Sequence, residues 1–120
     1  MSQAGSQAWA FYRDVAKNRV LWTVENEEGI PMTEIPDGRY AIPFWSSLSR
    51  VRKIAKMVPG YANYEPCEVS WDSFCSDWVP SLTRDGILVG LNWSGKKAIG
   101  YDGEAQGVME SIKAVMAESA

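Results

Sequence analysis

The sequence contains no histidine among its 120 residues. Imidazole is the most common general base near neutral pH and the commonest protein ligand of metals, so neither role can be filled by it here. Only two cysteines occur, Cys67 and Cys75, and two thiols without histidine cannot complete a tetrahedral zinc site. We therefore expect no metal and no cofactor. The spacing does not reveal whether the two cysteines form a disulfide, and we expect both to pack as small apolar groups.

Long apolar runs are also missing. No stretch approaches the roughly 20 residues that a membrane-spanning helix needs, and residues 1–7 lack the basic start and apolar stretch of a signal peptide. We therefore expect a cytoplasmic protein without membrane contact. The net charge is −3, from 12 Lys and Arg against 15 Asp and Glu, which makes nucleic acid a poor partner. We expect a protein or small-molecule partner, and a monomer or homodimer.

The composition is that of a folded domain. Hydrophobic residues make up 46% of the chain and charged residues 22%, and 120 residues allow one core. Amphipathic patterns predict helices over 6–18, 46–58, 70–79 and 104–117, and β-branched or aromatic runs predict strands over 20–24, 39–45, 66–69, 87–91 and 98–101. This order predicts a single α+β domain at 8–117, with a mixed sheet of about five strands packed against about four helices. Residues 1–7 are predicted to fray.

Three features refine this prediction. Trp71, Phe74 and Trp78 follow the spacing of a buried helical stripe, which Pro80 is expected to interrupt. The run 87–91 is apolar on both faces, which is typical of a central strand. Pro43 cannot donate to a ladder and indicates an edge or a bulge in the strand 39–45.

Two segments, Ser46–Arg50 and Asn92–Gly95, carry more polar character than a core requires. Each follows an apolar strand, and the carboxyl ends of parallel strands are where ligands bind in open sheets. We therefore expect the two segments to lie side by side and to form a ligand site. The predicted binding residues are Ser46, Ser47, Arg50, Asn92, Trp93, Ser94 and Gly95. In the alternative interpretation the serines only cap a helix and Asn92 only pins a turn.

An enzymatic alternative is also conceivable, from Ser, Lys, Tyr and Asp side chains in the segments 46–50 and 92–102. An enzyme without histidine could use Ser47 or Ser94 as nucleophile and Lys96 or Tyr101 as base. Tyr101 and Asp102 in sequence could serve acid–base chemistry, but we expect them to form a strand end and the cap of the last helix. The basic helix 50–56 could contact nucleic acid, although the negative net charge of the chain argues against it.

The same segments resemble the bacterial domain of unknown function 2750 family. The resemblance covers roughly residues 8–115, with Val51 standing where alanine is expected. It rests on Phe11–Asn18 with Trp22, Pro43–Arg50, Ser70-Trp71-x-x-Phe74, Trp78-x-Pro80-x-Leu82, Asp85–Gly90, Asn92–Gly95 and Gly100–Asp102. The order of elements is also similar to the N-terminal domain of SseB-type secretion-associated proteins, on two short motifs. Because the family carries no assigned activity, the resemblance implies a fold more than a function. We expect a non-catalytic module that binds a protein or a small ligand.

Overall fold

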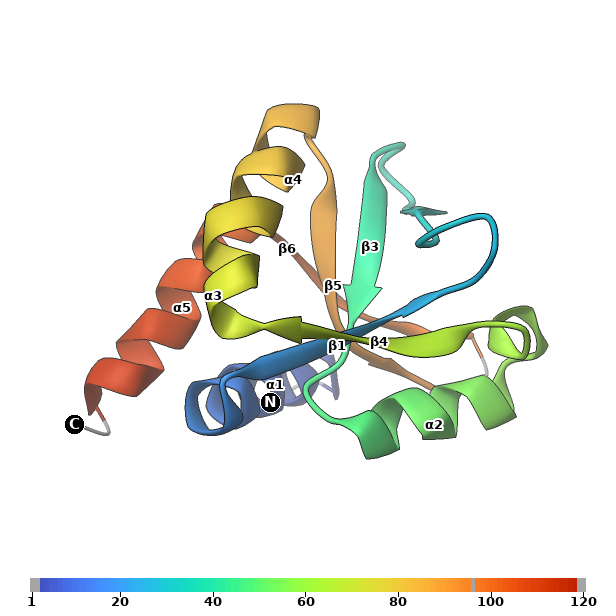
Figure 1. Cartoon of the computed structure of the whole chain (residues 1–120), viewed down its shortest axis with the longest axis horizontal. Coiled ribbons are helices and arrows are strands. Elements are labelled where there is room, and N and C mark those ends of the chain that lie inside the picture. The colour runs from blue at the N-terminus through green and yellow to red at the C-terminus, as the bar shows by residue number, and fades with distance from the viewer. Residues whose placement is uncertain (1–2, 96, 119–120) are drawn as a thin grey trace.

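A computed structural model describes residues 3–95 and 97–118, apart from the side chains at 3, 4 and 99. It confirms the α+β class (Figure 1). The helices and strands in chain order are α1 (Gln3–Asn18), β1 (Val20–Glu25), β2 (Thr33–Glu34), β3 (Tyr40–Phe44), α2 (Leu48–Met57), β4 (Glu65–Ser70), α3 (Trp71–Ser73), α4 (Val79–Asp85), β5 (Leu88–Ser94), β6 (Ile99–Glu104) and α5 (Ala105–Glu118). A short 3-10 turn at Pro59–Tyr61 follows α2.

The strands divide between two sheets, where the sequence predicted one. The larger sheet has the order β2-β3-β5-β6, in which β3 and β5 are parallel and the other pairs antiparallel. The second sheet is the antiparallel pair β1–β4, which runs across the ends of β3 and β5 (Figure 1). The sheets meet at one bridge, where Trp22 and Trp45 exchange backbone hydrogen bonds of 2.8 and 2.7 Å. β5 is central in the larger sheet, as predicted.

Pro43 lies where the outer side of β3 has no further strand. β2 pairs only with Tyr40 and Ala41, so the missing proline donor leaves no ladder bond unmade on that side. The Pro43 carbonyl accepts instead from the Thr23 hydroxyl at 2.7 Å. β3 is therefore an edge of the sheet at Pro43, as predicted, although β2 covers its first two residues.

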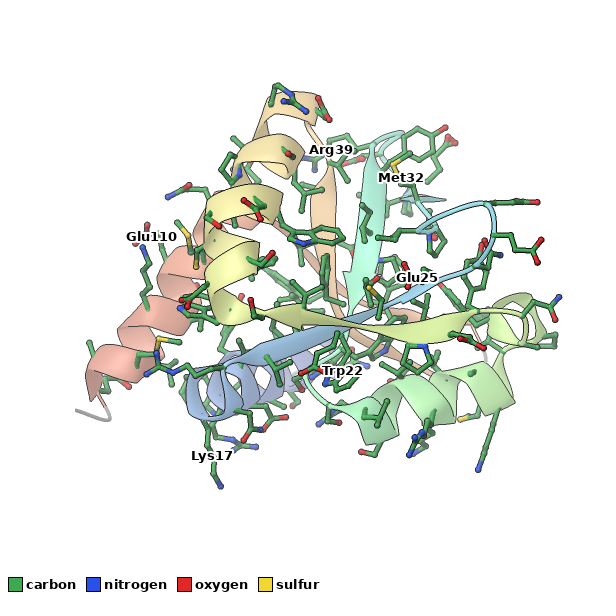
Figure 2. All side chains as sticks on the ribbon, viewed as in Figure 1. Lys17, Trp22, Glu25, Met32, Arg39 and Glu110 are labelled. Atoms are coloured by element: carbon green, nitrogen blue, oxygen red, sulfur yellow. The ribbon has the colours of Figure 1, made fainter. Side chains whose placement is uncertain are left out.

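Each face of the larger sheet carries its own core. Ile42, Phe44, Val89 and Leu91 face α1, α3, α4 and α5. The opposite face packs against α2, in a cluster that includes Trp45, Val51, Ile54, Tyr61, Leu88 and Trp93. Figure 2 shows Trp22 between β1 and α2, beside this second cluster, and Lys17 pointing outward from α1. No helix among the described residues is long and apolar enough to cross a bilayer.

The first helix begins earlier than the sequence predicted. α1 starts at Gln3 rather than Ser6, and the Gln7 side chain is buried. Within the predicted frayed segment 1–7, residues 3–7 are therefore helical, and residues 1 and 2 lie outside the described residues. The Gln7 amide nitrogen donates to Ser94 Oγ, a contact between distant segments that no local pattern reveals.

Pro80 does not end the third predicted helix. The backbone continues from Trp71 to Asp85 through a π-helical turn at Phe74–Trp78. In this wide turn the Val79 N–H bonds to the Phe74 carbonyl, five residues back. A π-helical turn contains one residue more than a regular α-helical turn, and this makes room for Pro80. In a regular helix a proline has no N–H to donate, and its ring collides with the carbonyl four residues earlier.

Candidate functional site

The two predicted polar segments meet at the carboxyl ends of β3 and β5. The backbone N–H of Ser46 donates to Asn92 Oδ1 at 2.8 Å, and Asn92 Nδ2 donates to Ser46 Oγ at 3.0 Å. Both side chains are only 1% exposed. The predicted adjacency of the segments is therefore confirmed. Asn92 also pins them together, so it has the structural role that the alternative interpretation gave it.

The polar network extends from this contact to α1 and α2. Ser46 Oγ donates to Asp14 Oδ2 at 2.8 Å, and Arg50 Nε lies 4.0 Å from the same carboxylate oxygen. Ser47 Oγ accepts from the Arg50 N–H at 3.3 Å and so caps α2. Both serines thus serve the structure, as in the alternative interpretation. Asp14 was not predicted, because nothing in its helical pattern distinguishes it.

The sequence predicted that the strand β5 ends at Leu91, and that prediction is wrong. β5 continues to Ser94 through a bulge, where the register with β6 shifts between Leu91 and Ser94. Asn92 adopts a left-handed backbone with φ of 51°, a conformation that asparagine tolerates better than most residues. The bulge turns the Trp93 ring onto the face of Gly90, which regular alternation would not do.

Glycines make the space that the Trp93 ring occupies. A Cβ at Gly90 would lie 2.3 Å from the ring, and one at Gly100 would lie 2.9 Å from it. Trp93 Nε1 donates to Asp102 Oδ1 at 2.8 Å, and the Trp93 carbonyl accepts from Trp45 Nε1 at 2.9 Å. Asp102 was predicted to cap the last helix. It lies instead within β6 and fixes the orientation of this indole.

We predict that Gly90→Ala destabilises the protein by about 1 to 3 kcal/mol, because the added methyl group must displace a packed ring. The φ of Gly90 is not in the left-handed region, so the cost comes from lack of space alone. Gly107→Ala in α5 is the matched control, since a Cβ there meets nothing within 4 Å. It should stabilise by up to about 1 kcal/mol through helix propensity. Urea unfolding measures both, and equal effects would contradict the close packing at Gly90.

Asp102 gives a prediction on pH. Burial raises the pKa of the Asp102 carboxyl above its usual range, the Trp93 N–H opposes this, and the charge of Asp37 adds to it. The folded state therefore binds this proton more tightly than the unfolded chain does. That contribution to stability is complete below the ordinary carboxyl pKa near 4 and is lost as pH rises through the raised pKa. Asp102→Asn should remove this loss.

Measuring the free energy of unfolding of wild type and Asp102→Asn from pH 3 to 7 tests the prediction on Asp102. The stability of Asp102→Asn relative to wild type should rise with pH and then level off. Asp85→Asn is the control, because Arg84 lowers the pKa of Asp85. Wild type should exceed Asp85→Asn at neutral pH and lose that advantage on acidification. A difference between Asp102→Asn and wild type that does not change with pH would contradict the prediction.

A pocket of about 290 Å³ opens beside the junction of the two segments, between α2 and the end of β5. Five of the seven predicted residues line it, and Ser46 and Ser47 do not. The described lining residues are Trp45, Arg50, Lys53, Ile54, Met57, Asn92, Trp93, Ser94 and Gly95. The predicted set lacks four lining residues, Trp45, Lys53, Ile54 and Met57. The last three lie one helical turn from Arg50 or from each other, and that spacing was a usable signal.

The pocket combines an apolar floor with a basic rim. Trp45, Ile54 and Trp93 are almost fully buried and form the apolar part. Arg50 and Lys53 supply two positive charges, and no described lining residue is acidic. The arrangement can hold an apolar group below and a negative charge above.

A larger hollow of about 580 Å³ has a different character. Its described lining is four glutamates and two asparagines, namely Glu25, Asn26, Glu27, Glu28, Asn63 and Glu65. No group of three or more acidic or cysteine side chains among the described residues is placed to hold a metal ion. Because every described lining residue of this hollow is polar and none is cationic, it is the weaker candidate for a small-molecule site.

Two of the four residues of the alternative enzymatic hypothesis make structural contacts. Ser47 caps α2, and Ser94 Oγ accepts from Gln7. Tyr101 is 44% exposed and lies on the side of β6 where Gly103 faces it, away from Asp102. Lys96 lies outside the described residues.

The profile of one protein family, described as protein of unknown function (DUF2750), matches residues 8–112. The chain belongs to this family. The match runs from the first turns of α1 into α5 and includes every residue that lines the pocket. A search of curated proteins finds no match to the chain. Membership in DUF2750 assigns no activity, so we infer the function from the pocket.

Proposed function

We propose that this DUF2750 domain is a non-catalytic module that binds a small molecule in the pocket between α2 and the end of β5. The observation that supports it best is the position of the pocket, outside the carboxyl ends of the parallel strands β3 and β5. Ligands of α/β sheets bind at such places, because the chain leaves each strand there and exposes polar groups.

The construction of the pocket wall supports the same role. Buried hydrogen bonds join Asn92 to Ser46 and Trp45 to Trp93. They hold the segment that follows β3 against the end of β5. A rigid pocket in which apolar side chains are combined with polar groups is a usual form of a small-molecule site. Its volume is at the lower end of the range for such sites, which favours a ligand of modest size.

Binding of small fragments, observed by NMR on labelled protein, tests the proposal. We expect fragments to shift the amide signals of residues 92–95 and of α2 residues 50–57. Met57→Trp adds bulk at the rim and should weaken these fragments, because Met57 lines the pocket. Lys56→Trp is the matched control on the exposed side of α2 and should leave them unchanged. Fragments that bind only elsewhere, or equal effects of the two variants, would refute the proposal.

A binding role also accounts better for the described contacts than an enzyme without histidine does. Such an enzyme needs a nucleophile and a base within hydrogen-bond reach. Ser47 Oγ accepts from the Arg50 N–H and Ser94 Oγ accepts from Gln7, and neither partner is a base. We further propose a cytoplasmic location, which the two free thiols, Cys67 and Cys75, support.

A further inference from the structure

We infer that the ligand is a small organic acid, in which a carboxylate or phosphate group is carried on a short apolar body. This inference rests on the proposed function, because it names the class of molecule that the same pocket takes. It follows from the placement of Arg50 and Lys53 above a floor of buried aromatic and aliphatic side chains.

The local charge selects an anion. α2 carries four basic residues, Arg50, Arg52, Lys53 and Lys56, and no acidic one, in a chain whose net charge is −3. Two of the four line the pocket, one helical turn apart and therefore on the same side of the helix. Fixed charges of one sign around a concave surface raise the local concentration of the opposite ion.

Arg50 is held in place by Asp14. Its Nε lies 4.0 Å from Asp14 Oδ2, and Ser46 fixes that carboxylate through its own hydrogen bond. The pair is partly exposed, with 39% of the Arg50 side chain accessible, so it neutralises the guanidinium only weakly. The remaining N–H groups of a guanidinium match the two oxygens of a carboxylate or phosphate.

The apolar lining of the pocket favours a ligand that carries an apolar group beside its charge. Trp45, Ile54 and Trp93 line the pocket with the small part of their surface that remains accessible, and Met57 adds to this apolar lining, so an apolar group that enters displaces water favourably. Met57 is 39% exposed at the rim, and its flexible side chain can adapt to the shape of the guest. An inorganic anion would use the two cations and leave this floor in contact with water.

The same burial disfavours nucleic acid on α2. Single strands are held by bases that stack on exposed aromatic rings along a basic groove. Trp45 is 1% exposed and Trp93 is 4% exposed, so neither can serve as a stacking platform. The four basic residues of α2 alone would give only weak binding that depends strongly on salt.

Four probes separate charge from apolar contact: benzoate, phenyl phosphate, benzyl alcohol and inorganic phosphate. NMR titration of the full chain should show benzoate or phenyl phosphate shifting residues 92–95 at least about tenfold more tightly than benzyl alcohol, because a charge-assisted contact is lost in the alcohol. Inorganic phosphate should also bind at least about tenfold more weakly than phenyl phosphate. Comparing the two aromatic anions tells a carboxylate site from a phosphate site.

Arg50→Gln and Lys53→Gln should each weaken the bound anion about tenfold or more and leave benzyl alcohol unchanged. Arg52→Gln is the matched control, since Arg52 is exposed on α2 and does not line the pocket. If benzyl alcohol binds as tightly as the anions, or if all three variants act alike, the inference fails while the proposed function stands. If no probe or fragment binds at this pocket, both fail. Preferential binding of a single-stranded oligonucleotide would also overturn the inference.

Discussion

Trp71→Ala is expected to lower the free energy of unfolding by about 3 to 5 kcal/mol. Trp71 is 8% exposed, and its ring stacks on Phe74 with 6.1 Å between centroids. Phe74 in turn meets Phe44 of β3 edge to face at 5.6 Å, so the stack continues into the sheet. Removing the indole leaves a cavity at the start of the long helix, which neighbouring rings cannot close without breaking these contacts.

Trp9→Ala is the control for this substitution. Trp9 belongs to α1 and is 45% exposed, so its removal should cost less than about 1 kcal/mol. Urea unfolding of the two variants beside wild type gives the comparison. A loss below about 1 kcal/mol in Trp71→Ala would show that the helical stripe does not form the core that we describe.

The stripe itself could be read from the sequence, because a spacing of three and four residues places side chains on one side of a helix whatever surrounds them. The effect of Pro80 could not. A proline ends a regular helix, but the helix here widens at Phe74–Trp78 and continues. Packing of Trp71, Phe74 and Leu82 against the same sheet favours one continuous helix, and that packing is a tertiary effect.

The sheet was harder to predict than its strands. Five of the six strands have a local signature, and the two-residue β2 at Thr33–Glu34 does not. Whether the strands form one sheet or two depends on pairing between distant segments. Here β1 pairs along its length with β4, and it meets the β3 segment through the bridge between Trp22 and Trp45 and the hydrogen bond from Thr23 to the Pro43 carbonyl. The composition of β1 contains no signal for this choice.

The site was predictable in position and not in detail. Two strands that run in parallel end at one edge of a sheet, so the meeting of Ser46 with Asn92 followed from the strand assignments. The orientation of Trp93 depends on a bulge that arises from pairing with β6, and the pattern of alternating faces predicts the wrong side. Gly90 and Gly100 were the usable signal, because glycine within a strand often marks a close approach.

Asn92→Ala is expected to cost about 3 to 5 kcal/mol, an effect as large as that of removing Trp71. Its side chain accepts from the buried Ser46 N–H and donates to Ser46 Oγ, and each buried polar group left without a partner costs about 1 to 3 kcal/mol. Alanine must also adopt the left-handed backbone at φ of 51°, which costs roughly 1 to 2 kcal/mol more.

Asn92→Gly separates the two causes, because glycine adopts the left-handed conformation without strain and still lacks the amide. It should regain only the conformational part, about 1 kcal/mol relative to alanine, and remain well below wild type in urea unfolding. Full recovery in Asn92→Gly would mean that the bulge needs a permissive backbone and that the hydrogen bonds to Ser46 contribute little. A persistent deficit, together with altered NMR signals at residues 46–50, would show that one buried amide joins the start of α2 to the end of β5 and so holds the two walls of the pocket together.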